Sequence, residues 1–164
     1  MKKYLKAVVS GLCAAALALG CVSCGSSIAQ NEKPTQVTNI TVWTYYNGDQ
    51  LESFTDLVDK FNETVGAEKG IVVSTESLGS VNDLEQSVMD AAEGKVGAPA
   101  MPNVFSAYAD TVYALDQMGM VVDLAPYLTD DEKAKFIDGY LSEGDFDDNG
   151  SVKIFPVAKS TEVM

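Results

Sequence analysis

The sequence predicts an α/β fold with an open, largely parallel sheet flanked by helices. From residue 40 onward, short runs of β-branched and aromatic residues alternate with segments whose apolar residues recur at helical spacing. This alternation is typical of successive βα units. Clusters of Gly, Asn and Ser separate the segments, as expected for the turns between them.

The first two βα units have the clearest patterns. Residues 40–46 are β-branched and aromatic and predict a strand, which an amphipathic helix follows. We interpret residues 66–70 as the end of that helix and residues 71–78 as a second strand. Ser80 then caps a second helix, with Asp83 in its first turn, where the helix dipole favours an anion. The expected apolar face of this helix comprises Val81, Leu84, Val88, Met89 and Ala92.

Shorter elements are expected in the rest of the chain. They are a loop over residues 94–102, a strand over 103–106, a helix over 109–118, a helix opened by the capping box Thr129–Glu132 and reaching about Ile137, a hairpin-like segment over 146–151 and a final strand over 152–157.

The charge of the chain excludes several functions. Its 164 residues include 24 acids and 11 cations, all of them lysines, for a net charge of −13. Such a surface repels nucleic acid. The absence of histidine and arginine removes the imidazole base and the guanidinium fork. We therefore expect a protein that is not an enzyme, with no catalytic residues, no metal site and no cofactor.

The N-terminus predicts export and a lipid anchor. A basic start and an uncharged apolar run of about 13 residues make residues 1–20 a signal peptide, since a membrane span needs roughly 20 apolar residues. The stretch Leu-Ala-Leu-Gly before Cys21 resembles a lipobox, so Cys21 is the expected acylated residue, with Cys24 as the alternative. Residues 21–39 are polar and contain Gly, Ser and Pro, as expected for a tether.

Two acidic patterns are candidates for sites of chemistry. Asp145 to Gly150 matches the first half of a calcium loop, but the twelfth position is Pro156 instead of a glutamate. A polar turn joining two strands is the favoured interpretation. The pair Asp130 and Asp131 is expected by chance in so acidic a chain, and sequence spacing cannot place two carboxylates on opposite sides of one bond.

Aromatic residues give the best indication of a ligand. Trp43, Tyr45 and Tyr46 lie where the first strand enters its turn, at the carboxyl edge where open α/β sheets bind ligands. Aromatic rings pack on the C–H faces of sugars, and their polar groups bond hydroxyls. For Trp43, a place in the core is the alternative.

Four stretches together resemble the bacterial extracellular solute-binding proteins of family 1. They are the strand at 40–46 with the helix ending at Phe61-Asn62, the segment 94–105 with Asn103 in place of a usual Asp, the segment 115–124, and Pro156-Val157-Ala158-Lys159-Ser160-Thr161. The resemblance covers residues 40–164.

The resemblance implies a periplasmic-binding-protein-like fold of two lobes that close on a ligand. Residues 40–164 would be most of the N-terminal lobe, and because the chain stops within a hydrophobic-polar alternation we expect it to be truncated. Ser160 becomes a hydroxyl donor near the hinge and Asp110 an acidic ligand contact. Asn82 and Asp83 occupy a region that faces the cleft.

The resulting expectation is a monomeric substrate-binding lipoprotein of an ABC importer. It would capture a sugar or oligosaccharide outside the cytoplasm, while anchored to the bacterial cell membrane, and deliver it to the membrane permease. Two alternatives remain open from the sequence. One is a structural or adhesive surface lipoprotein, and the other is a secreted lipid-anchored hydrolase whose catalytic part is missing.

Overall fold

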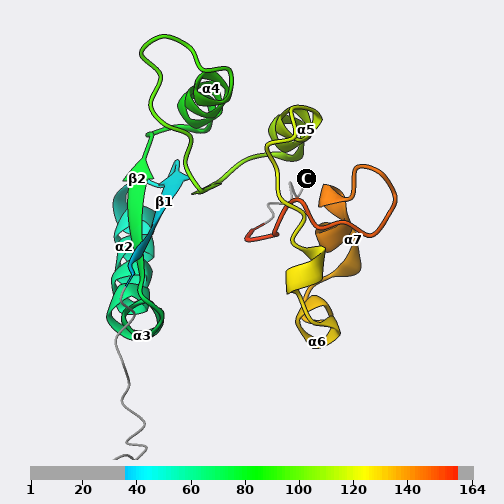
Figure 1. The fold of residues 1–164 in the computed structure, drawn as a ribbon, viewed down its shortest axis with the longest axis horizontal. Helices are drawn as coiled ribbons and strands as arrows, with labels where there is room; N and C mark the ends of the chain where they lie inside the picture. The colour runs from blue at the N-terminus through cyan, green and yellow to red at the C-terminus, as the bar shows by residue number, and fades with distance from the viewer. Residues whose placement is uncertain (1–35, 159–164) are drawn as a thin grey trace, which may run out of the picture. The chain divides into compact units, whose positions relative to one another are not determined.

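The computed structural model describes residues 36–158, which belong to one compact unit over residues 33–164. Its centre is a parallel sheet of β1 (Thr38–Thr44), β2 (Ile71–Ser77) and β3 (Val104–Phe105), in the order β2-β1-β3 (Figure 1). The sequence prediction of a parallel sheet with helices between its strands is confirmed. The first strand begins two residues earlier than expected, and Tyr45 and Tyr46 follow it instead of belonging to it.

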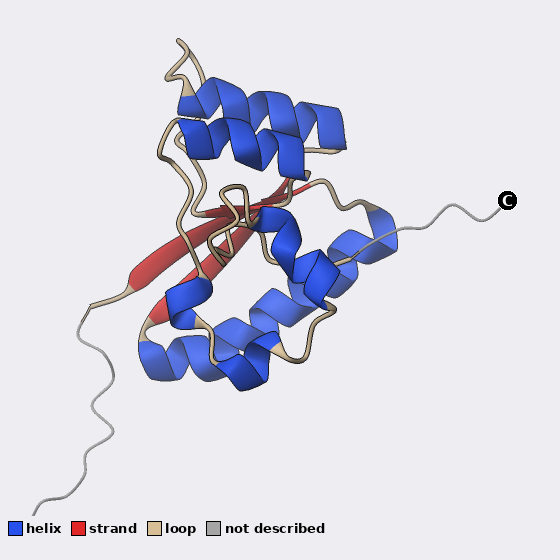
Figure 2. Ribbon diagram, turned by 90° about the vertical axis from the view of Figure 1, so that its right-hand side faces the viewer, coloured by secondary structure: helices blue, strands red, loops and turns tan. Residues whose placement is uncertain are grey.

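Helices cover both faces of this sheet. Helices α4 (Val81–Ala92) and α5 (Ala109–Gln117) lie side by side on one face, and α2 (Gly48–Phe61) lies on the other (Figure 2). The buried cluster beneath α4 and α5 consists of Trp43, Leu84, Val88 and Leu115. Of the apolar face expected for α4, Leu84 and Val88 are buried, and Met89 and Ala92 pack against the cluster.

The helix that follows β1 ends within residues 66–70, as the sequence predicts. A π-helical segment, η1 (Asn62–Gly66), and a further turn, α3 (Ala67–Lys69), extend it to Gly70, whose φ of 70° closes it in the left-handed region. Gly66 is buried within the helix, and a Cβ placed on it would lie 2.5 Å from the carbonyl oxygen of Ile71. Gly66 therefore allows the helix to approach β2 closely, and Gly70 ends the helix.

Short helical turns make up the segment after α5. They are η2 (Ala125–Tyr127), α6 (Asp130–Lys133), α7 (Asp138–Leu141) and η3 (Ser142–Gly144). The predicted capping box is confirmed, since Thr129 and Glu132 exchange side-chain to backbone hydrogen bonds of 3.2 and 2.9 Å. The helix ends before Ile137, because the N–H groups of residues 135 and 136 bond three residues back.

The strand predicted over residues 152–157 is not formed, and neither is the hairpin before it. The backbone of Val152 donates to the Asp123 carboxylate at 2.8 Å and accepts from Leu124 at 2.9 Å, while Lys153 N–H donates to Gly144 at 3.4 Å. A strand needs a neighbouring strand to satisfy its backbone. Here the Asp123 side chain and the backbones of Leu124 and Gly144 supply the partners, so this segment does not form a strand.

We expect Gly66→Ala to lower the free energy of unfolding by about 1–3 kcal/mol, because the new methyl group meets the Ile71 backbone, which cannot move aside. Urea unfolding followed by circular dichroism measures the loss. The control is Gly139→Ala, where nothing lies within 4 Å of the added Cβ and the residue is helical. That change should be neutral or stabilising by up to about 1 kcal/mol. Equal stabilities for the two variants would contradict the close-approach role of Gly66.

Candidate functional site: the carboxyl edge of the sheet

The three parallel strands bring their carboxyl ends to one edge of the sheet. Trp43 on β1 is level with Glu76 on β2 and with Phe105 on β3, so the turns that follow the strands are neighbours. Helices α2, α4 and α5 begin at these turns. In open α/β folds, ligands bind at this edge. The structure therefore places the predicted aromatic residues and the starts of the predicted binding helices in one region.

Side-chain hydrogen bonds hold the first two turns together. The Asn47 amide nitrogen donates to the carbonyls of Tyr45 at 3.0 Å and Gly79 at 2.7 Å. The Ser77 hydroxyl donates to the Tyr46 carbonyl at 2.6 Å. These bonds tie the turn after β1 to the turn after β2. The sequence alone did not indicate this bridging role of Asn47, because its partner Gly79 lies 32 residues away.

The three aromatic residues have different environments. Trp43 is 3 % exposed and lies in the core, which was one of the two roles open to it from the sequence. Tyr45 is half-buried, and its ring meets that of Tyr46 edge to face at a centroid distance of 5.3 Å. Burial raises the pKa of Tyr45, and the neighbouring phenols of Tyr46 and Tyr108 raise it further. The Tyr45 hydroxyl therefore keeps its proton at neutral pH and can donate a hydrogen bond.

A hollow of about 480 Å³ lies between α4 and α5. The hollow is shallow and largely open to solvent. Most of its lining residues carry oxygen atoms that accept hydrogen bonds, and none of them is a cation. The lining residues are Asn82, Glu85, Gln86, Met89, Asp110, Thr111 and Ala114. Such a set suits a ligand that offers several hydroxyl or N–H donors.

The hollow unites two residues that the sequence analysis proposed from different segments. Asn82 comes from α4 and Asp110 from α5, and both line it. Glu85, Gln86 and Thr111 were missed. The signal that would have found Glu85 and Gln86 is their spacing from Asn82, since residues three and four apart share a helix face.

Asp83 is occupied by the start of its own helix. Its carboxylate accepts a hydrogen bond of 2.6 Å from the Ser80 hydroxyl, which in turn accepts from the Asp83 N–H at 3.1 Å. This confirms the predicted cap and leaves Asp83 outside the lining of the hollow. Ser160, Cys21 and Cys24 lie outside the described residues.

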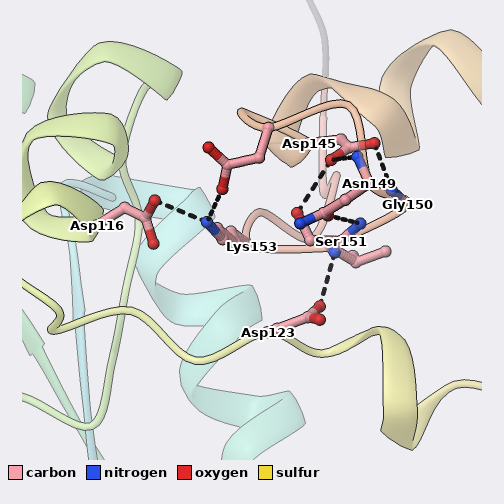
Figure 3. Close-up of polar contacts among 9 residues, drawn as sticks. Asp116, Asp123, Asp145, Asn149, Gly150, Ser151 and Lys153 are labelled. Atoms are coloured by element: carbon pink, nitrogen blue, oxygen red, sulfur yellow. Dashed lines mark hydrogen bonds and ion pairs between the residues drawn. The ribbon is translucent and has the colours of Figure 1, made fainter.

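A second polar cluster joins α5 to the segment after η3 (Figure 3). The Lys153 ammonium bonds the Asp116 carboxylate at 2.7 Å and that of Asp147 at 3.1 Å. Lys153 and Asp116 are each 12 % exposed, and these hydrogen bonds, that of Asp116 foremost, raise the pKa of the lysine. The cluster fixes the position of α5 and hence one wall of the hollow.

In the loop from Asp145 to Gly150, which resembles the first half of a calcium site, the Asp145 carboxylate is hydrogen-bonded to the loop itself and to Ser151. The Asp145 carboxylate accepts from the N–H groups of Asn149 and Gly150 at 3.0 and 2.8 Å, and from the Ser151 hydroxyl at 3.1 Å (Figure 3). These bonds, that of Gly150 foremost, lower the pKa of Asp145. Within residues 36–158 no group of three or more Asp, Glu, His or Cys is placed to hold a metal ion.

The family model for bacterial extracellular solute-binding proteins matches residues 56–164. The chain therefore belongs to this family, and no curated protein sequence matches it. Among residues 36–158, no helix combines the length and apolarity needed to span a bilayer.

Solved structures of solute-binding proteins share the fold. A cyclic α-maltosyl-1,6-maltose binding protein from Arthrobacter globiformis has a TM-score of 0.54 at 22 % identity over 68 % of this chain and 26 % of its own. The maltose/maltodextrin-binding domain MalE from Bdellovibrio bacteriovorus, bound to maltotriose, has a TM-score of 0.53 at 20 % identity over 70 % and 27 %. A family 1 extracellular solute-binding protein from Bifidobacterium longum subsp. infantis has a TM-score of 0.52 at 14 % identity over 72 % and 27 %. The chain thus spans about a quarter of the length of these structures.

We expect Asp123→Ala to lower the melting temperature at pH 7, because it leaves the N–H groups of Ala125 and Val152 without their acceptor. Hydrogen bonds from these two groups, that of Val152 foremost, lower the pKa of Asp123. Its contribution is therefore present above the unfolded pKa of about 4 and lost as pH falls through the lower folded pKa.

The gap in melting temperature between wild type and Asp123→Ala should accordingly narrow below about pH 4. Differential scanning calorimetry from pH 7 to pH 2.5 measures it. Asp131→Ala, at an exposed position of α6, is the control and should leave the curve unchanged. A gap that stays constant with pH would contradict the role of the carboxylate charge.

Proposed function

We propose that this chain is part of an extracytoplasmic substrate-binding lipoprotein of an ABC importer, which captures a sugar or oligosaccharide for delivery to the membrane permease. The family match over residues 56–164 carries the proposal. The members of this class bind solutes and carry out no chemistry on them, so we assign no catalytic role to any residue.

The chemistry of the hollow supports a neutral, hydroxyl-rich solute. Its carboxylates, Glu85 and Asp110, accept hydrogen bonds from hydroxyls, and the amides of Asn82 and Gln86 can both accept and donate. An anionic solute would be repelled, because no cation lines the hollow. The structural relatives include proteins whose described ligands are maltose-type oligosaccharides.

In this proposal, Tyr45 is the aromatic residue that contacts the sugar. Its neutral hydroxyl is a donor, and Tyr108, which is 62 % exposed, lies close enough to influence the Tyr45 pKa. Tyr108 immediately precedes α5 and its Asp110, so aromatic and acidic groups reach the same edge of the sheet. Trp43 contributes from the core, by holding β1 against α4 and α5.

We also propose that a second lobe forms the other half of the binding cleft. Two lobes would close around the solute, with contacts made only in the closed state driving the closure. Ser160 would lie near the hinge between the lobes, and the receptor would act as a monomer.

We expect Glu85→Ala and Asp110→Ala each to weaken sugar binding by ten- to a hundredfold in the full-length receptor, because a hydrogen bond to a charged group contributes about 1.5–3 kcal/mol. A thermal-shift screen of sugars, amino acids, polyamines and peptides first identifies the solute. Calorimetry then measures its affinity, with Asp56→Ala on the exposed side of α2 as the control.

The results of these measurements test the proposed function and the proposed binding site independently. Stabilisation by a polyamine or peptide instead of a sugar would overturn the ligand class and keep the binding function. Unchanged affinity in both variants would exclude the hollow as the site. A cooperatively melting receptor that no solute stabilises would overturn the proposed function.

We expect Cys21→Ser to abolish acylation and release the protein from the membrane, since Cys21 follows the apolar run of the signal directly. Metabolic labelling with a palmitate analogue, followed by fractionation, measures both effects. Cys24→Ser is the matched variant and should remain labelled and bound to the membrane. The reverse pattern would assign the anchor to Cys24.

A further inference from the structure

Asn47 occupies the N-cap position of α2, but its side chain does not cap the helix. At this position an asparagine usually accepts a hydrogen bond from a backbone N–H of the first helical turn. Here its nitrogen instead donates to the carbonyls of Tyr45 at 3.0 Å and Gly79 at 2.7 Å. An amide nitrogen carries two hydrogen atoms, so both donors of Asn47 are engaged. Capping of α2 therefore does not account for this side chain.

The bond to Gly79 holds the chain immediately before α4. Ser80 follows Gly79 and caps this helix with its hydroxyl. Asn82 and Glu85, in the first two turns of α4, line the hollow. A displacement of Gly79 would therefore move the start of the helix that carries these two lining residues.

The bond to Tyr45 acts on the aromatic side of the same region. The Tyr45 ring packs against the buried cluster of Trp43, Leu84, Val88 and Leu115, of which Leu84 and Val88 belong to α4. The ring thus lies against the cluster beneath α4, while the backbone of Tyr45 is bonded to the carboxamide that also holds the residue before the α4 cap. One side chain connects the aromatic residue with the helix that carries the acceptors.

We propose that Asn47 is a positioning residue for solute recognition, whose carboxamide sets the placement of Tyr45 relative to Asn82 and Glu85 on α4. The consequence for affinity rests on the proposed function, whereas the placement itself does not. A solute that contacts both elements binds more tightly when neither has to be reordered, because ordering of loops and side chains at a site costs binding free energy. Asn47 acts in this way without contacting the solute.

A second link between the same turns keeps variants of Asn47 folded. The Ser77 hydroxyl donates to the Tyr46 carbonyl at 2.6 Å and accepts from the Gly79 N–H at 3.3 Å. The pairing of β1 with β2 also continues to Thr44 and Ser77. Loss of the Asn47 carboxamide should therefore loosen Tyr45 and the start of α4 while the sheet stays intact.

The first test needs no solute. Asn47→Ser keeps a residue that is favoured at helix N-caps, but its single O–H donor can serve only one of the two carbonyls. In the full chain, NMR of tyrosines labelled at Cζ, assigned with Tyr45→Phe, gives the pKa of the Tyr45 phenol. Burial raises this pKa, followed by the neighbouring phenols of Tyr46 and Tyr108. In Asn47→Ser the pKa should fall toward the ordinary value of a phenol, because the ring loses burial.

Two controls separate placement from general stability. Asn39→Ser makes the same substitution at an exposed position of β1, and Gly66→Ala is destabilising in η1, beyond the other end of α2. Both should leave the pKa of Tyr45 as in the wild type. A Tyr45 pKa that is unchanged in Asn47→Ser, or that falls equally in Gly66→Ala, would overturn the proposal.

The second test measures affinity in the full-length receptor. A linear trisaccharide of glucose is the probe, and calorimetry is performed at a temperature where every variant is folded. Asn47→Ser should bind about tenfold more weakly, the effect of one to two neutral hydrogen bonds, whereas both controls should bind as the wild type does. Equal affinities of Asn47→Ser and the wild type would overturn the role of Asn47 in recognition. A wild-type receptor that no sugar stabilises would overturn the proposed function, and the phenol titration would still decide the placement of Tyr45.

Discussion

Strand β1 is the element on which the rest of the described structure depends. It pairs with β2 along its whole length and with β3 at its carboxyl end, and it carries Trp43 into the core. Because burial of apolar area is the main stabilising term in folding, the contact of this ring with Leu84, Val88 and Leu115 fixes α4 and α5 on one face. The hollow between those helices exists because both pack on the same side chain.

Side-chain amides complete the sheet at places where the backbone alone does not. Asn103 continues the pairing of β3 with β1, since its amide oxygen accepts from the Thr41 N–H at 2.9 Å while its own N–H donates to the Thr41 carbonyl at 3.1 Å. Asn47 links two turns, and Asn62 makes two hydrogen bonds to the Val73 backbone of β2. Asparagine suits this work because its side chain carries the same donor and acceptor as a peptide group.

The helices and strands that have local sequence patterns could be predicted. Features that depend on contacts between residues far apart in the sequence could not. Alternating periodicities placed β1, β2, α4 and α5, and the Thr129 to Glu132 spacing placed a cap, because each signal lies within a few residues. The helix end within residues 66–70 was predicted, but the close approach at Gly66 was not, because its contact with the Ile71 backbone is a tertiary feature. The segment after Gly150 has strand-like residues, but its backbone partners come from Asp123 and Gly144. At the candidate site, the family resemblance implied Asn82 and Asp110, which line the hollow. Glu85 and Thr111 also line it, but only the packing of α4 beside α5 shows this.

The polar contacts of residues 145–153 reach the hollow without lining it. Asp123 bonds Val152 across 29 positions of the sequence, and Asp116 bonds Lys153 across 37. Closing such long loops has an entropic cost that the contacts must repay. Because Asp116 belongs to α5, a change at Lys153 alters the support of one wall of the hollow although Lys153 is not part of its lining.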